Sequence, residues 1–356
     1  MPAPEGEPIP ALAAPPQGAS VRITRMRFTD ADHLSEATRH ARIEVSVAGG
    51  RGYHGGLVTL EAPELKIQWG FHGVPLMVSG QVKEPAILSV WGSGGSGRCN
   101  GQAMGRGVLF YPAGTELQSR SDGACGRVSA SVSNLESLAR SLAPDLDLAE
   151  GSGRRYADGA REAVAVIRSL LLTARRAVES GGAALRDASA RRALAEQLGM
   201  AIVRAVAGDR PNRRREGIAA CAALVRGAEE ILRARRYQPV SVPELCKVLG
   251  ASEARLREAF QRIYGTGPSS YLRLRRLHLV RRKLRTTRRE ECTVSAAASS
   301  LGFYEFGRFA GEYRAVFGEL PSKTERARAE GSLAAETGRP VGGAAHSPVC
   351  PEITDR

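Results

Sequence analysis

The stretch "VSVPELCKVLGASEARLREAF", residues 240–260, carries the signals for two short helices joined by a tight turn. Ser241 can cap the first helix, and Glu244, three residues later, completes a capping box. Gly250 ends this helix, and Ser252 caps the next one. Leucine, alanine and phenylalanine side chains between these positions supply a small shared core. The spacing predicts a helix-turn-helix unit, whose second helix can enter the major groove of DNA.

A similar pattern recurs at residues 293–318. Thr293 can cap a first helix, Gly302 ends it, and Phe303 leads into a second one. Between the two patterns, "GPSSYLRLRRLHLVRRKLR", residues 267–285, predicts a connecting helix of about 17 residues, roughly 26 Å long. Successive major-groove faces lie about 34 Å apart. Two helix pairs joined by such a helix can therefore contact one side of a duplex.

Positive charge is concentrated in the same region. The chain of 356 residues has a formal net charge of +14, and residues 231–330 contain 21 Lys and Arg residues against 10 Glu and no Asp. A basic cluster of this kind predicts an anionic partner, for which double-stranded DNA suits the paired helices. A solvated arginine-rich surface is the alternative interpretation of the charge alone.

The rest of the chain divides into segments of different composition. Residues 1–18 are rich in proline and alanine, which predicts a disordered tail. Residues 19–133 alternate short apolar runs with glycine-rich breaks, which predicts a β-rich domain. Residues 134–236 carry helical apolar stripes, which predict a connector that packs on the sheet, on itself or on a second copy of the chain. The helix-turn-helix region then occupies 237–328, and 329–356 form a flexible tail. The predicted fold class is α+β.

The sequence contains no recognisable catalytic or metal-binding pattern. No cysteines or histidines have the spacing of zinc ligands, and no Ser/His/Asp order or pair of acids is evident. The glycine run at 92–97 satisfies GxGxxG, but no helical pattern follows it, so it does not predict a dinucleotide site. We therefore expect that the protein has no catalytic residue, no metal and no cofactor, and that it is not an enzyme.

Membrane and export signals are also missing from the sequence. No run reaches 18 uninterrupted apolar residues, and residues 1–18 contain neither Lys nor Arg, so neither a membrane span nor a signal peptide is predicted. The six scattered cysteines are most simply explained as reduced thiols. These features predict a cytoplasmic protein.

The C-terminal residues resemble a known family, the AraC/XylS-type transcriptional regulators. The resemblance spans about 239–323, with "LCKVLGASEARLREAF", "YLRLRRLHLVRRKL" and "TVSAAASSLGFYEFGRFAGEYRAVFGELPS" in the family's order and spacing. It implies a double helix-turn-helix domain that reads adjacent major grooves of promoter DNA, with RNA polymerase as a further partner if the protein activates. Two positions depart from the family pattern: Cys246 replaces a small alanine, and Glu258 replaces a basic residue.

The resemblance places the base contacts at the front of the second helix of each pair. Arg255, Arg257 and Arg308 are then the leading base readers, because a guanidinium can bond both acceptors of a guanine. Glu305 can accept from a cytosine or simply favour a helix N-terminus. The other expected DNA contacts are Tyr304 on a phosphate or a thymine methyl, Ser252 at the start of the first reading helix, and Arg273 and Arg276 on phosphates. Tyr304 is nearly as plausible as an aromatic packed beside the helix start.

The resemblance also implies that the β-rich domain is a cupin-like barrel that senses a small molecule or mediates a homodimer. A metal-binding cupin needs a histidine near its glycine and proline turn, where this chain has Leu117, so no metal is expected there. The aromatic residues on the candidate strands either line an effector pocket or belong to the core, namely Trp69, His72, Trp91 and Tyr111. Two other functions remain as alternatives: a nucleic-acid enzyme that uses the C-terminal region as a tether, and a nonspecific architectural DNA binder.

Overall fold

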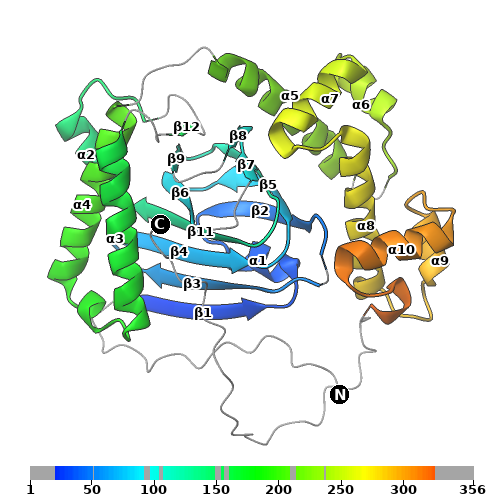
Figure 1. The fold of residues 1–356 in the computed structure, drawn as a ribbon, viewed down its shortest axis with the longest axis horizontal. Coiled ribbons are helices and arrows are strands. Elements are labelled where there is room, and N and C mark those ends of the chain that lie inside the picture. Colours follow the sequence, from blue (N-terminus) through cyan, green and yellow to red (C-terminus); the bar gives the residue numbers. More distant parts are fainter. Residues whose placement is uncertain are drawn as a thin grey trace, which may run out of the picture.

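The structure is a computed structural model that describes residues 21–50, 52–91, 97–103, 107–148, 154–155, 160–208, 214–235 and 238–324. The tails predicted at 1–18 and 329–356 lie outside the described residues. The described chain has a β-rich part in the middle and helices on both sides of it (Figure 1). This arrangement confirms the predicted α+β class.

The β-rich part consists of two antiparallel sheets. The larger sheet has the order β1 (Arg22–Phe28), β3 (Gly55–Glu61), β4 (Leu65–His72), β11 (Cys125–Val132), β6 (Ala86–Trp91), β9 (Val108–Tyr111) and β12 (Arg154–Arg155). The smaller one has the order β2 (Ala41–Val47), β5 (Leu76–Val82), β10 (Glu116–Ser121), β7 (Gly97–Cys99) and β8 (Gln102–Ala103). Each predicted apolar run lies on one of these strands, whereas the polar strand β1 and the helix α1 (Ala31–Ala37) were not predicted. The resemblance to a cupin stays a prediction.

Helices cover the outer face of the larger sheet: α2 (Leu135–Leu142), α3 (Arg161–Glu179), the short 3-10 helix η1 (Ala183–Arg186) and α4 (Ala188–Ala207). Alternate residues of β4 explain this, because Ile67 and Trp69 point outward into the apolar cluster that contains Ile167 and Leu198. The predicted stripe of α3 is fully buried there. Packing on the chain's own sheet therefore accounts for the stripes of α3 and α4.

The remaining helices lie on the side of the smaller sheet: α5 (Arg214–Ala234), α6 (Val242–Leu249), α7 (Glu253–Tyr264), α8 (Pro268–Thr286), α9 (Val294–Ser299), α10 (Phe306–Phe317) and the short η2 (Pro321–Lys323). Helix α5 packs in one cluster with α6 and α7, through Val225 and Leu232 against Leu245 and Phe260. Residues 134–236, predicted as a single connector, thus pack on two different parts of the chain. Helices α3 and α4 pack on the larger sheet, whereas α5 packs on the first helix pair.

A buried carboxyl group joins the smaller sheet to these helices. Glu229 of α5 is 3% exposed and accepts hydrogen bonds from Gln118 of β10 at 3.1 Å and from the Tyr271 hydroxyl of α8 at 3.0 Å. The Tyr264 hydroxyl of α7 also donates to it. Burial raises the pKa of the Glu229 carboxyl, although these donors act in the opposite direction. The sheet, α5, α7 and α8 therefore meet at one side chain.

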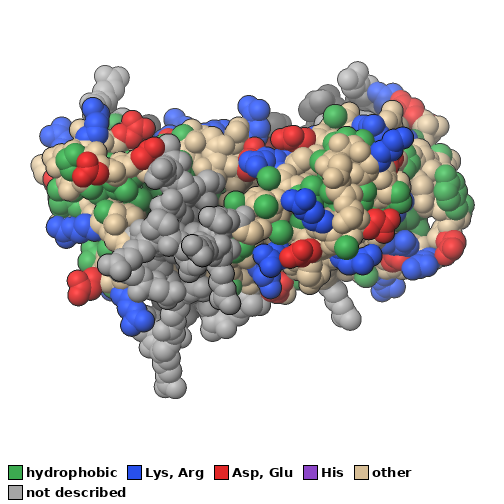
Figure 2. Space-filling model, turned by 90° about the horizontal axis from the view of Figure 1, so that it is seen from above, with side chains coloured by type: hydrophobic (Ala, Val, Ile, Leu, Met, Phe, Trp, Pro, Cys, Tyr) green, Lys and Arg blue, Asp and Glu red, His purple; other side chains and the backbone are tan. Residues whose placement is uncertain are grey.

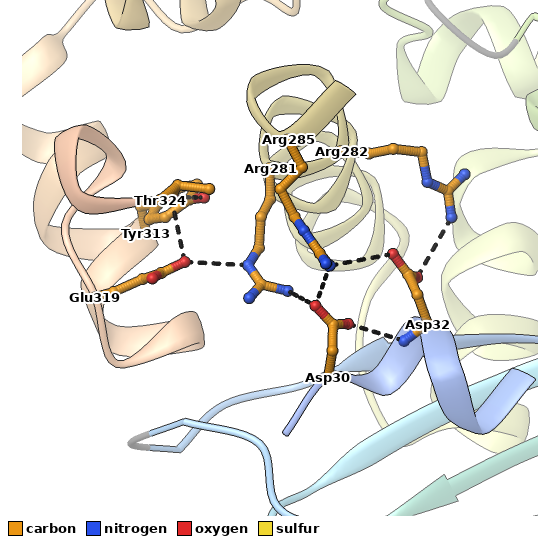
Figure 3. Close-up of polar contacts among 8 residues, drawn as sticks. All are labelled: Asp30, Asp32, Arg281, Arg282, Arg285, Tyr313, Glu319 and Thr324. Atoms are coloured by element: carbon orange, nitrogen blue, oxygen red, sulfur yellow. Dashed lines mark hydrogen bonds and ion pairs between the residues drawn. The ribbon is translucent and has the colours of Figure 1, made fainter. Parts of the chain in front are cut away.

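A second junction ties α1 to the long helix α8 (Figure 3). Asp30 caps α1 by accepting from the Asp32 backbone N–H at 2.9 Å, and it also accepts from Arg281 at 3.0 Å and from Arg285. Its side chain is only 8% exposed. Burial acts to raise the pKa of Asp30, but the two arginines and the Asp32 N–H outweigh it and lower the pKa. The carboxylate is thus ionised and held by opposite charges.

Substitution of Asp30 by Asn tests this junction, because Asn retains the helix cap but removes the charge. Among the described residues, the substitution leaves Arg281 with Glu319 as its remaining acidic partner and Arg285 with only the 4.0 Å contact to Asp32, so we expect a loss of about 3 kcal/mol in unfolding free energy by chemical denaturation. The matched control is Asp32→Asn, whose side chain is 42% exposed and whose loss should stay below about 1 kcal/mol. Equal effects of the two substitutions would contradict the assignment.

Candidate nucleic-acid interface

The first helix pair has the predicted local structure. Ser241 and Glu244 form a complete capping box at the start of α6, and Gly250 ends the helix in the left-handed conformation with φ of 60°. Ser252 caps α7 by accepting from the Arg255 backbone N–H at 3.3 Å. Cys246 packs at the edge of the cluster that holds the pair together, as a small hydrophobe can. The capping prediction is confirmed.

The front of α7 presents two arginines to solvent. Arg255 and Arg257 are both exposed, and neither side chain forms an ion pair with any described residue. Glu258, which stands where the family has a basic residue, pairs with Arg262 at 3.2 Å along the same helix. Both guanidinium groups can therefore reach an acceptor outside the chain without first breaking an internal contact.

The second helix pair has the predicted N-cap, but its first helix, α9, ends at Ser299 and not at Gly302. Thr293 accepts from the Ala296 N–H at 3.1 Å, and Gly302 adopts φ of 80° after α9. Behind α10, four aromatic rings form a continuous buried row with centroids 4.6 to 5.7 Å apart, namely Phe303, Phe309, Tyr313 and Phe317. This row holds the second pair together.

The start of the second reading helix differs from the prediction. Tyr304 and Glu305 were expected in its first turn, but α10 begins at Phe306, and Glu305 is the residue before it. The reason is that Phe303 is only 5% exposed and lies against the core, so the chain needs two further residues to leave the core before the helix starts. Tyr304 and Glu305 therefore belong to the turn in front of the helix.

This turn and the first turn of α10 are very exposed. Tyr304 is 76% exposed, which does not support packing beside the helix start, and Phe306 is 45% exposed. Phe306 was not expected as a contact residue, although a large apolar residue at the first position of a reading helix was a usable signal. Gly307 adds to the open surface, since a Cβ there would meet no atom within 4 Å. A tight helix crossing within the chain therefore does not explain this glycine.

Arg308 lies between two carboxylates. Its Nε donates to Glu312 at 3.1 Å, and a second nitrogen is 3.9 Å from Glu305. Glu312 is itself held by Arg273 through two hydrogen bonds of 2.5 and 2.8 Å, and these arginines lower the pKa of its carboxyl group. Arg308 is 64% exposed, so its pairing is weak and can be exchanged for another acceptor.

Several arginines of α8 form ion pairs or ring contacts inside the chain. Arg273 is bound to Glu312, and Arg276 lies over the Phe303 ring at 5.3 Å, where burial lowers its pKa. Arg281 connects Asp30 to Glu319 of the second pair. Figure 2 shows one face of the molecule, on which Lys and Arg side chains are mixed with Asp and Glu. Phosphate contacts from Arg273 and Arg276 remain predictions.

The predicted effector residues separate into two groups. Trp69 is 9% exposed and belongs to the core between the larger sheet and the helices α3 and α4. His72 and Tyr111 instead line a cavity of about 130 Å³ between the two sheets, and Leu117 lines it as well. The side chain of Trp91 lies outside the described residues. Among the described residues, no group of three or more His, Cys, Asp or Glu side chains is placed to hold a metal, and no helix is long and apolar enough to cross a bilayer.

Comparison with known proteins places the C-terminal region. Residues 245–327 match the family model of a helix-turn-helix domain. The XylDLEGF operon transcriptional activator 3 of Pseudomonas putida is 37% identical over 26% of this chain and 28% of its own length. The "Probable thc operon regulatory protein" of Rhodococcus erythropolis is 35% identical over 29% of this chain and 31% of its own. The chain thus spans less than a third of the length of these two relatives.

A solved structure covers the same region more completely. It comes from Rhodopseudomonas palustris CGA009 and is described as "a probable AraC family transcriptional regulator". It is 36% identical, and the match covers 29% of this chain and 94% of that one, with a TM-score of 0.26. Together with the paired helices and their caps, the family-model match and these two relatives show that the C-terminal region of the chain is a helix-turn-helix domain of the AraC/XylS type.

Proposed function

We propose that the protein is a sequence-specific DNA-binding transcriptional regulator. The observation that carries this proposal is the pair of helix-turn-helix units, both with exposed front residues, fixed to the single helix α8. That helix has 19 residues and therefore spans roughly 28 Å at 1.5 Å per residue, close to the spacing of successive major-groove faces. The relatives named as operon activators support a regulatory role.

Within this proposal, the two units divide the contacts with DNA. Base contacts come from Arg255 and Arg257 in the first unit and from Arg308 and Glu305 in the second. Tyr304 and Ser252 lie beside them at the groove edge. Arg273 and Arg276 can contact phosphates only after they exchange their internal contacts, so their share of the binding energy is small. Because α5 packs with α6 and α7, we also propose that the DNA-binding unit begins at α5.

The β-rich domain supplies the control in this proposal. Its polar contacts with the DNA-binding unit include those of Asp30 with α8 and of Gln118 of β10 with Glu229 of α5, so a change in the domain reaches the helices directly. The signal is a small molecule or a second copy of the chain, and RNA polymerase is the further partner if the protein activates. A nucleic-acid enzyme and a nonspecific DNA binder are the competing functions.

Selection of bound sequences from a random pool of duplex DNA tests the function. The full chain should enrich one motif with two half-sites separated by one helical turn, about 10 base pairs, because each unit reads one major-groove face. Enrichment without a motif would identify a nonspecific binder, and cleaved or modified DNA would identify an enzyme. Either result would contradict the proposal.

Arg308→Ala tests base reading in the second unit. We expect at least a tenfold loss of affinity for the selected motif and a relaxed preference at one base position, because a bidentate arginine contributes about 1–3 kcal/mol of discrimination. The control is Arg314→Ala at the exposed end of the same helix, which should keep the base preference. Electrophoretic mobility shifts on the motif and its single-base variants measure both. An unchanged preference in Arg308→Ala would remove this residue from the readers.

Gly307→Ala separates helix stability from DNA contact. Alanine is favoured over glycine in a helix by about 1 kcal/mol, and the added methyl group meets nothing in the free protein. Thermal unfolding should therefore occur at a higher temperature, while affinity for the motif should fall if DNA comes close to this position. Gly311→Ala, which also adds a methyl group in open space one turn later, is the control. A gain of stability without any loss of affinity would show that DNA does not approach Gly307.

A further inference from the structure

The cavity between the two sheets has mainly apolar walls. Its volume is about 130 Å³, and its lining includes Leu57, Leu76, Val78, Ile87 and Leu117. An engineered apolar cavity of about 150 Å³ binds benzene, so this cavity suits an organic molecule of roughly that size. Among the polar side chains that line it, three have a group without a hydrogen-bond partner among the described residues.

The first of these groups is the guanidinium of Arg127. This arginine lies on β11, lines the cavity, and has buried Nε and Nη2 atoms with no hydrogen-bond partner among the described residues. The residue opposite it on β4 is Gly70, which has no side chain to fill the space in front of the guanidinium. A buried charge without a counter-ion is strongly unfavourable. The arrangement therefore calls for an anion supplied from outside the chain.

The other two groups are histidine nitrogens. Nδ1 of His72 donates to the Val74 carbonyl oxygen at 2.8 Å, so the proton is on Nδ1 and the buried Nε2 is an unpaired acceptor. Burial and the nearby Arg127 lower the pKa of His72 to about 3, which keeps the ring neutral. His40 also lines the cavity, with Nδ1 facing the Glu84 carboxylate at 3.2 Å and an unpaired Nε2. The Nε2 of His72 therefore requires a donor, and the Nε2 of His40 requires a partner.

We propose that this cavity binds a small organic acid that also carries a hydroxyl or amine group. The carboxylate accepts from Arg127, the hydroxyl or amine donates to His72, and the apolar body contacts the leucine, valine and isoleucine walls. This inference rests on the proposed function, because it names the chemical class of the signal that the β-rich domain receives. Neutral sugars and hydrocarbons lack the charge that Arg127 needs.

The position of the cavity connects this molecule to the DNA-binding unit. Leu34 and Thr38, which belong to α1 and its C-terminal cap, line the cavity. Asp30 at the other end of the same helix holds Arg281 and Arg285 of α8. On the sheet side, Leu117 of β10 faces the cavity and the neighbouring Gln118 bonds Glu229. A bound molecule therefore contacts two of the elements that dock the DNA-binding helices, α1 and β10.

The test is thermal unfolding of the full chain with 2-hydroxyisocaproate and with its neutral analogue isocaproamide. The hydroxy acid should raise the unfolding temperature in a saturable way, and the amide should not. In Arg127→Met the response should disappear, with at least about a tenfold weaker Kd from the lost charge-assisted hydrogen bond. The same variant without ligand should unfold at an equal or higher temperature, since an uncompensated buried charge has been removed. If Arg127 had a merely structural role, Arg127→Met would instead lower the unfolding temperature of the ligand-free protein.

Two further variants complete the design. Arg42→Met, on the exposed face of β2, should respond to the acid like the original chain. His72→Phe should still bind the acid but lose its preference for 2-hydroxyisocaproate over isocaproate. Equal shifts with acid and amide, no shift with either, or an unchanged response in Arg127→Met would overturn the inference. If the chain selects a DNA motif but no acid binds, only this inference fails. If the acid binds but no motif is selected, the proposed function fails and the cavity assignment stands.

Discussion

The ion pairs of Arg281 hold three parts of the molecule in one arrangement. Its guanidinium reaches Asp30 of the β-rich domain at 3.0 Å and Glu319, just after α10, at 3.2 Å, and it lies over the Phe317 ring at 5.1 Å. Because these partners come from the β-rich domain and from the end of the second helix pair, they hold the long helix α8 in position relative to both. The exposed readers of the two pairs are presented together as a consequence.

The same contacts explain what the arginines of α8 do. Their number predicts a helix whose surface faces DNA, but several of them are turned inward against Asp30, Glu312, Glu319 and aromatic rings. A guanidinium is suited to such positions, because it forms two parallel hydrogen bonds with a carboxylate and stacks on a ring. The basic excess of the region is therefore partly neutralised by its own acids. Arg255 and Arg257, at the front of α7, are among the arginines that have no such partner within the described residues.

Sequence reasoning was sufficient where the signal is local. The capping box at Ser241 and the left-handed glycines at Gly250 and Gly302 depend only on neighbouring residues, so they could be predicted together with the helix pairs. The contact of Asp30 with Arg281 joins residues 251 positions apart, and no local pattern indicates it. Alternation identified β4 as a strand but not which face meets the helices, so Trp69 and His72 appeared equivalent although one is in the core and the other faces the cavity. The start of α10 depends on the burial of Phe303, which is a tertiary effect.

The two polar sites of the β-rich domain, at Asp30 and at Arg127, differ in whether the charge is paired within the chain. At Asp30, the carboxylate is surrounded by arginines, its pKa is lowered, and the pair is complete within the chain. At Arg127, the guanidinium has no described carboxylate, and two histidine nitrogens that line the same cavity lack hydrogen-bond partners among the described residues. A complete pair fixes a junction, whereas an incomplete set of polar groups favours any state in which a further molecule completes it. Asp30 caps α1, and the same helix lines the cavity that contains Arg127. The free energy of binding a molecule in the cavity can therefore act on the helix that Asp30 caps.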